Sequence, residues 1–181
     1  MRYFYSLESS DLGTFSLVWS ELNNKIKIIR VLLPETRPNL ILKIKKEYPS
    51  AKKSDSLDEL ACEIKKLISG EEIKFNLDLL DFDICTDFEK KVLIADYNIP
   101  MGYVSTYSRI AKSIGVPKGA RAVGNALANN PFPLIIPCHR VIRSDGRLGG
   151  FGGGLEMKKK LLENEGLFLS DGKINETKIY Y

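Results

Sequence analysis

The N-terminal third of the chain carries short runs of apolar and aromatic residues that are typical of β-strands. Runs rich in valine, isoleucine, tyrosine and phenylalanine occupy residues 2–6, 14–19 and 25–33, which predicts three strands. Asn23 and Asn24 stand between the second and third runs. Asparagine suits the backbone of a tight turn, so we expect a hairpin at this point.

A helical period replaces the strand pattern at residues 56–70. Apolar residues recur there every three or four positions, which predicts an amphipathic helix. They are Leu57, Leu60, Ala61, Ile64, Leu67 and Ile68. Ser56 and Glu59 have the spacing of a capping box, and Gly70 is a suitable stop. Acidic residues cluster at residues 77–87, and we place a domain boundary within this cluster, after residue 85.

Beyond this boundary the pattern is mostly helical. Thr86 and Glu89 have the spacing of a second capping box. The apolar residues that follow share one helix face: Phe88, Val92, Ala95 and Ile99. Thr106 can cap a second, short helix that ends at Gly115, and a third helix covers about residues 119–128. Two short helices joined by a tight turn suggest a helix-turn-helix.

The third helix has one face of unusually small residues. Successive residues of a helix are 100° apart, which turns one set of side chains inward: Ala120, Val123, Gly124 and Leu127. The same geometry turns another set outward: Arg121, Ala122, Asn125 and Ala126. Small residues let a helix backbone approach a nucleic-acid groove closely. The competing interpretation is an alanine-rich surface helix with one solubilising arginine.

Composition is that of an ordinary globular protein. The 181 residues are 44% hydrophobic and 28% charged, which suits one large or two small domains. No apolar run approaches the ~20 residues of a membrane helix, and no signal peptide is visible. Three cysteines without a CxxC pair make a disulfide framework improbable. We therefore expect a cytoplasmic protein that does not enter a membrane.

The formal net charge of +4 conceals an uneven distribution. Residues 102–160 hold 10 Lys and Arg against 2 Asp and Glu, a local excess of 8 positive charges. Such an excess attracts polyanions through counterion release, which favours a nucleic-acid partner. A solvated basic face without a partner is the alternative.

The candidate chemistry lies in the segment that contains Cys138, His139 and Arg140. A thiol acts as a nucleophile only as thiolate, and a nearby imidazole and cations favour that form. Cys62 and Cys85 have no such neighbours and are expected to be inert. Adjacent residues of an extended segment face opposite sides, so proton transfer needs a turn or a bridging water here. A buried structural cysteine is the alternative.

A carboxylate and a glycine-rich loop accompany this segment. The helix expected at residues 155–165 carries an apolar stripe of Leu155, Leu161 and Leu162, and Glu165 falls within that stripe. A hydrogen bond to His139 would compensate its burial and orient the imidazole; exposure at a frayed end or pairing with a lysine is the alternative. The preceding loop, residues 148–154, has five glycines and Phe151, which could stack on a base. A flexible linker or lid is the other interpretation.

Several of these segments together resemble the O6-alkylguanine-DNA alkyltransferases. The likeness runs from about residue 88 to residue 166. It rests on Ile-Pro-Cys-His-Arg-Val at 136–141 and on residues 99–107, 120–124, 130–131 and 161–166. The resemblance implies an α+β fold: residues 1–85 form an α/β domain with a small antiparallel sheet, and residues 86–170 form a mainly helical domain with the helix-turn-helix. Residues 171–181 are left as a C-terminal tail.

The resemblance also implies roles for single residues. Cys138 is similar to the alkyl acceptor, His139 to a base acting through water, and Glu165 to its orienting carboxylate. Further residues correspond to supporting positions in DNA binding and in the alkylguanine pocket. They are Tyr107 (phosphate contact and proton donor), Asn130 (support of the active-site turn), Arg121 (finger into the base stack), Ala122 and Asn125 (DNA contacts), Val141 (acceptor for the guanine amino group), and Phe151 and Gly152 (pocket wall and donor to O6). Many relatives have tyrosine in place of Phe151. From the residues alone, Tyr107 could equally be a core aromatic.

The function implied is repair of double-stranded DNA containing O6-alkylguanine, with O4-alkylthymine as a second candidate substrate. A stable thioether on Cys138 would allow one turnover per molecule without a cofactor. Some relatives hold zinc in the N-terminal domain, but this chain has no histidine there, so we expect no metal. We expect a monomer. The alternatives are an alkylguanine-binding sensor without transfer, a Cys–His hydrolase and a transcriptional helix-turn-helix protein.

Overall fold

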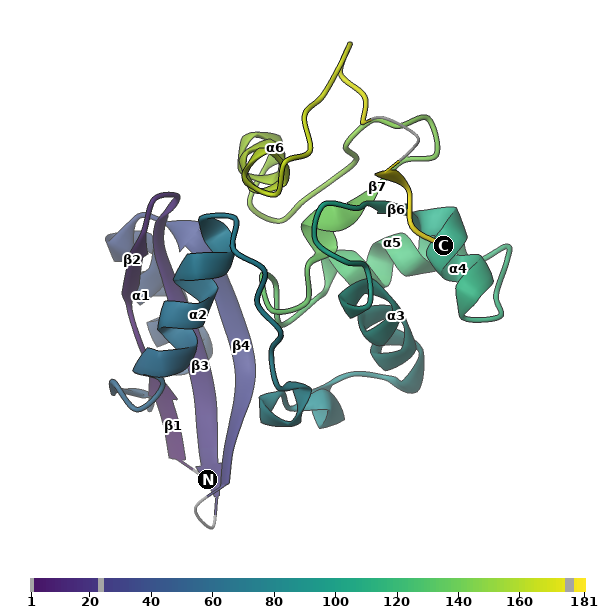
Figure 1. Cartoon of the computed structure of the whole chain (residues 1–181). Helices are drawn as coiled ribbons and strands as arrows, with labels where there is room; N and C mark the ends of the chain where they lie inside the picture. The colour runs from purple at the N-terminus through teal and green to yellow at the C-terminus, as the bar shows by residue number, and fades with distance from the viewer. Residues whose placement is uncertain (1, 23–24, 175–177) are drawn as a thin grey trace. The chain divides into compact units, whose positions relative to one another are not determined.

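The computed structural model describes residues 2–22, 25–174 and 178–181. The chain divides into two compact units (Figure 1). The first contains Met1–Ile84 and Pro131–Pro133, and the second contains Cys85–Asn130 and Leu134–Tyr181. The predicted segments 1–85, 86–170 and 171–181 remain a prediction of domain organisation. In the part of the chain that the structure describes, no helix is long and apolar enough to cross a membrane.

The first unit is built on a small, mostly antiparallel sheet. Its strands are β1 (Arg2–Tyr5), β2 (Glu8–Ser10), β3 (Gly13–Leu22), β4 (Lys25–Glu35) and β5 (Lys52–Lys53). Strand β3 pairs antiparallel with β1, β2 and β4, whereas β5 runs parallel to β1. The three predicted strands are thus confirmed, with β4 two residues longer than expected. The hairpin turn predicted at Asn23 and Asn24 lies outside the described residues.

Two helices complete the first unit. Strand β3 is buried continuously over residues 15–20, so both of its faces are covered. Helix α1 (Arg37–Glu47) supplies Leu40 and Ile44 to a core cluster with Val18. Helix α2 (Asp58–Ile68) buries the predicted stripe from Leu60 onward. The sequence analysis had not identified α1, whose apolar face is narrow: only Leu40 and Ile44 are buried.

The start of α2 differs from the prediction. Leu57 occupies the N-cap position, and no side chain caps this helix. The Ser56 hydroxyl bonds instead to the Ser54 hydroxyl at 2.8 Å. Asp58 and Glu59 lie in the first turn, where negative charge is favourable next to the helix dipole. The capping box predicted from Ser56 and Glu59 is therefore wrong.

The second unit is mainly helical. Its helices are α3 (Asp87–Tyr97), α4 (Tyr107–Ser113), α5 (Ala120–Ala128) and α6 (Leu155–Asn164), and a two-stranded parallel sheet joins β6 (Ser105–Thr106) to β7 (Val141–Ile142). The capping box of Thr86 and Glu89 is confirmed by hydrogen bonds of 3.2 and 2.9 Å. Thr106 caps α4 as predicted. Together the two units confirm the predicted α+β class.

The last described residues pack into the second unit. The Val104 amide donates to Lys178 O at 2.9 Å, and the Tyr180 amide donates to Val104 O at 2.6 Å, which places this segment beside β6 (Figure 1). Ile174 is buried in a cluster with Val104, Ile142 and Leu162. Ile174 therefore contributes to the core of this unit, and Lys178 and Tyr180 are bonded to its backbone.

Candidate active site

The segment with Cys138 is held in a tight turn. Residues Cys138–Arg140 form a single 3-10 turn, in which the Arg140 amide donates to Pro137 O at 2.8 Å. The Asn130 side-chain amide donates to Ile136 O at 3.0 Å and so fixes the approach to this turn. Leu134, fully buried nearby, has a φ of 76°, an unusual value for a branched residue. The sequence analysis gave a turn here as one route to proton transfer and a bridging water as the other, and the turn is present.

The turn separates Cys138 from its neighbour in the sequence. Residues of a 3-10 helix are about 120° apart, and His139 extends toward Glu165 instead of the thiol. Burial raises the pKa of the Cys138 thiol to about 12. The charge of Asp96 acts in the same direction, whereas a hydrogen bond from Asn130 and the charge of Lys158 oppose it. The sequence analysis expected the nearby imidazole and cations to favour the thiolate. In the structure burial outweighs such an effect, and His139 and Arg140 bind Glu165 instead.

Glu165 lies directly after α6. His139 Nε2 lies 2.8 Å from Glu165 Oε1, and the glutamate side chain is only 2% exposed. Arg140 binds the same group from the other side: Nε is 2.9 Å from Oε2, and Nη2 is 2.9 Å from Oε1. Although burial opposes ionisation, these two partners hold the pKa of Glu165 at about 2. The predicted contact of His139 with Glu165 is therefore present.

The other side of the imidazole is free to accept a proton. Burial lowers the pKa of His139 despite the nearby carboxylate. Because Glu165 accepts at Nε2, the neutral ring carries its proton there. The second nitrogen, Nδ1, is buried and has no hydrogen-bond partner among the described residues. The lone pair of this nitrogen can therefore accept a proton, and it belongs to the residue that directly follows Cys138 in the sequence.

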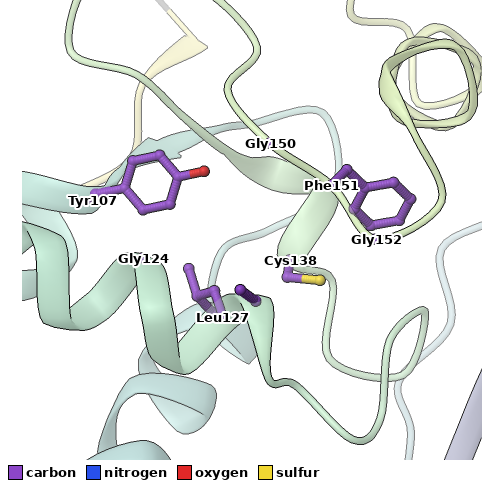
Figure 2. A pocket seen from close by; sticks show the side chains of 8 residues that line it. Tyr107, Gly124, Leu127, Cys138, Gly150, Phe151 and Gly152 are labelled. Carbon is purple, nitrogen blue, oxygen red and sulfur yellow. The ribbon is translucent and has the colours of Figure 1, made fainter.

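A pocket of about 280 Å³ opens onto the thiol. Figure 2 shows Tyr107 on one side of the pocket, and Cys138 with Phe151 on the other. The complete lining comprises Tyr107, Gly124, Leu127, Ala128, Cys138, Gly150, Phe151 and Gly152. Tyr107 is half-buried, and burial raises the pKa of its phenol, so this side chain stays protonated at neutral pH. The structure therefore places Cys138, Tyr107, Phe151 and Gly152 around one cavity.

Lys158 is a residue of this region that the sequence analysis missed. Its side chain is fully buried, and Nζ donates to Val141 O at 2.6 Å and to Gly150 O at 3.2 Å. Burial lowers the pKa of this lysine to about 8. The lysine ties the glycine-rich loop to the strand after Cys138. Its position three residues before Leu161 on the inward face of α6 was the available signal.

The hydrogen bond from Lys158 affects the role that the resemblance implies for Val141, which is to accept a hydrogen bond from the guanine amino group. The residue is buried, and its carbonyl oxygen already accepts from Lys158. A guanine amino group at this oxygen would therefore use the second lone pair.

Two residues of the loop before α6, Gly153 and Phe151, pack against neighbouring side chains, whereas Gly150, Gly152 and Gly154 are exposed. A Cβ on Gly153 would lie 2.4 Å from the Met157 sulfur. Phe151 meets the His139 ring edge to face with 6.3 Å between centroids. Leu155, in contrast, is 54% exposed, so its predicted inward orientation is wrong. Leu155 is the first residue of α6, and the buried residues of this helix begin at Lys158.

Helix α5 presents most of its predicted outer face. Arg121, Ala122 and Asn125 are exposed, whereas Val123 and Leu127 are buried. Ala126, expected outside, is 4% exposed and packs inward. An alanine at the edge of the buried face is small enough to be covered by neighbouring side chains. Arg121, Ala122 and Asn125 remain accessible to a partner.

Asp96 on α3 is a second residue that the sequence analysis missed. It is fully buried, and neither carboxylate oxygen has a partner among the described residues. Burial raises its pKa to about 8, although Arg140 and Lys158 oppose this. It lies four residues after Val92, on the inward face of its helix, which was the available signal.

Comparison with known proteins agrees with this site. Residues 87–167 match the family described as 6-O-methylguanine DNA methyltransferase, DNA binding domain. The crystal structure of Mycobacterium tuberculosis O6-methylguanine methyltransferase is 31% identical, with a TM-score of 0.71 over 90% of this chain and 92% of that one. The chain belongs to the O6-methylguanine DNA methyltransferase family. Every residue of the Cys138 pocket lies within the stretch that matches this family.

One relative and one further solved structure extend the comparison with the methyltransferase family. The methylated-DNA–protein-cysteine methyltransferase of Methanothermobacter thermautotrophicus is 46% identical over 114 residues, which are 63% of this chain and 64% of that protein. The alignment thus spans just under two thirds of that relative's length. The structure of Mycobacterium tuberculosis OGT in complex with DNA is 30% identical, with a TM-score of 0.72 and coverage of 90% of this chain and 92% of that chain.

Proposed function

We propose that this chain repairs double-stranded DNA by moving the alkyl group of O6-alkylguanine to Cys138. The observation that carries the proposal is the pocket of about 280 Å³ that opens onto Cys138, the residue next to a His139 that is hydrogen-bonded to Glu165. The names of the relatives support it, since they are called methylated-DNA–protein-cysteine methyltransferases. O4-alkylthymine is a second candidate substrate. The proposal includes a monomer that acts in the cytoplasm without a cofactor.

The proposed reaction is a direct displacement. The sulfur of Cys138 forms a bond to the O6-alkyl carbon as the bond from that carbon to O6 breaks. The thiol proton passes to His139 Nδ1 through a water, and the departing guanine takes a proton at N3 from the Tyr107 phenol. The high pKa of the thiol makes this proton acceptor necessary. The thioether product does not revert, so each molecule reacts once.

Glu165 and Arg140 have supporting parts in this scheme. Glu165 holds the imidazole so that Nδ1 remains an acceptor, and it stabilises the imidazolium once the proton arrives. Arg140 keeps the glutamate ionised. Asn130 fixes the turn through Ile136 O.

DNA enters the proposal through α5 and the basic second unit. A lesion within a duplex reaches a pocket of this kind only when its nucleotide is flipped out, at a cost of a few kcal/mol. Arg121 would enter the base stack, while Ala122 and Asn125 lie against the groove. Phe151 would line the guanine, and the Gly152 amide would donate to O6. The M. tuberculosis relative solved with DNA supports this partner.

Intact mass after incubation with a duplex containing O6-methylguanine tests the proposal. We expect a gain of one methyl group per protein, with no further gain at excess DNA. The control is Cys138→Ala, which must show none. Lesion binding without a mass change would favour a sensor, continued turnover would favour a hydrolase, and the absence of both binding and transfer would overturn the proposal.

A further inference from the structure

Residues 178–181, here called the strap, lie along one edge of β6 as an additional parallel strand (Figure 1). The Val104 amide donates to Lys178 O at 2.9 Å, and the Tyr180 amide donates to Val104 O at 2.6 Å. The Ser105 hydroxyl donates to Tyr180 O at 2.9 Å. Because successive residues of a strand direct their backbone groups to opposite edges, β7 pairs with the other edge of β6. The strap therefore extends the two-stranded sheet to three strands.

Tyr181 connects the strap to two helices. Its phenol donates to Ala95 O in α3 at 2.8 Å. Its backbone oxygen accepts a hydrogen bond from Arg109 Nη1 in α4. One residue thus joins the helix that precedes β6 to the helix that follows β6.

The elements that the strap holds are short. Strands β6 and β7 pair over only two residues each, and α4 has seven residues. A ladder or a helix of this length has little stability of its own, so its position depends on tertiary contacts. The strap supplies such contacts along the edge of β6 that does not face β7, and at α4 itself.

The same two strands lead to opposite sides of the alkyl-acceptor pocket. Tyr107 directly follows β6, and β7 begins three residues after Cys138. The pairing of β6 with β7 therefore fixes the separation of the phenol and the thiol, which line one pocket. Proton donation requires the donor within hydrogen-bond distance of the acceptor, so a small displacement of β6 would lower the rate of transfer.

We propose that the strap is a positioning element for alkyl transfer, which holds Tyr107 at the distance from Cys138 that proton donation to guanine requires. The inference rests on the proposed function, in which the Tyr107 phenol supplies the proton to N3. No residue of the strap is among the described residues that line the pocket. The strap acts through β6 and α4, and Tyr181 is its positioning residue.

Single-turnover methyl transfer from a duplex containing O6-methylguanine, at saturating DNA, tests this role. Tyr180→Pro removes the amide that donates to Val104 O. We expect its first-order rate constant to fall roughly tenfold. Tyr180→Ala is the matched control, because it loses the same side chain but keeps the amide, and its rate constant should fall by less than about twofold. Equal rate constants for these two variants would overturn the proposal.

Tyr181→Phe is a second variant, which keeps the ring and removes one hydrogen bond, to Ala95 O. Its rate constant should fall about two- to threefold. Tyr180→Phe is its control, since the structure gives the Tyr180 hydroxyl no hydrogen bond among the described residues, and it should react at the wild-type rate. This pair tests the strap even where Tyr180→Pro does not fold.

A double-mutant cycle shows whether the strap acts through Tyr107. In a Tyr107→Phe background, which has no phenol proton to donate, Tyr180→Pro or Tyr181→Phe should change the rate constant by less than about twofold and about 1.5-fold respectively. The full loss in both backgrounds would mean that the strap only stabilises the fold, and would overturn the proposal. Wild-type protein that gains no methyl group would instead refute the proposed function.

Discussion

Glu165 and Asp96 are both buried acids of the second unit, yet their surroundings differ completely. Glu165 receives hydrogen bonds from His139 and Arg140, and its pKa is held at about 2. Asp96 has no hydrogen-bond partner among the described residues, and its pKa is raised to about 8. Burial is common to both, so the partners decide which acid is ionised. The ionised acid is the one that orients the candidate base.

Removing the partner of Glu165 is the strongest way to break this contrast. Arg140→Met leaves the buried carboxylate of Glu165 with His139 as its one remaining hydrogen-bond partner among the described residues. We expect the free energy of unfolding to fall by about 3 to 5 kcal/mol, as measured by chemical denaturation at pH 7. Adding Glu165→Gln to this variant should recover part of the loss, because the unpaired charge is then absent. A loss below about 1 kcal/mol would show that Arg140 does not compensate the glutamate.

The opposite result is expected at Asp96. Asp96→Leu removes a buried carboxyl that has no hydrogen-bond partner in the described part of the chain, so the free energy of unfolding should rise by about 1 to 3 kcal/mol at pH 7. The exposed Asp83 offers a control, since Asp83→Leu should change stability by less than about 0.5 kcal/mol. Destabilisation by Asp96→Leu would mean that the carboxyl has a favourable partner after all.

The two acids should also give pH dependences of opposite sign. The folded-state pKa of Asp96 is about 8, above its unfolded value near ~4. Folding thus retains a proton, and stability falls as pH rises from about 4 to about 8. For Glu165 the folded pKa is about 2, so its contribution is present above about pH 4 and is lost as pH falls toward 2.

Unfolding experiments across pH can separate these two windows. Asp96→Asn should remove the fall in the free energy of unfolding between about pH 4 and pH 8. Glu165→Gln should remove the change in the free energy of unfolding between about pH 2 and pH 4. Each group accounts for a slope of at most about 1.4 kcal/mol per pH unit. Unchanged slopes in both variants would refute the two assignments.

The starts of α3 and α2 also differ in whether a polar side chain finds a hydrogen-bond partner, and here the expected effect on stability is smaller. Thr86 and Glu89 make both bonds of a capping box, whereas Ser56 makes none to α2. Thr86→Ala should therefore cost about 1 kcal/mol, and Ser56→Ala less than about 0.5 kcal/mol. Thermal unfolding of the two variants provides the comparison, and equal losses would contradict it.

Local pattern was sufficient for much of this protein. The strands of the first unit, the buried stripe of α2 and the capping box before α3 depend on residues within a few positions of one another. The stripe of α6 also predicted that Glu165 faces inward, which required only helical geometry. Helix α1 was not predicted, because its apolar face consists of just two buried residues.

The α+β class, most of the helices and strands, and the motifs shared with the methyltransferase family could be predicted from the residue pattern alone. The contact of His139 with Glu165 was one of two interpretations that the pattern allowed. Tertiary structure decided how the charges are distributed. Arg140 bonds to Glu165, Lys158 joins the glycine-rich loop to Val141, and Asp96 has no hydrogen-bond partner among the described residues. The physical reason is that periodicity records which face of an element is buried. The ionisation of a buried group depends instead on partners brought close by folding, such as Glu165, 25 residues from Arg140.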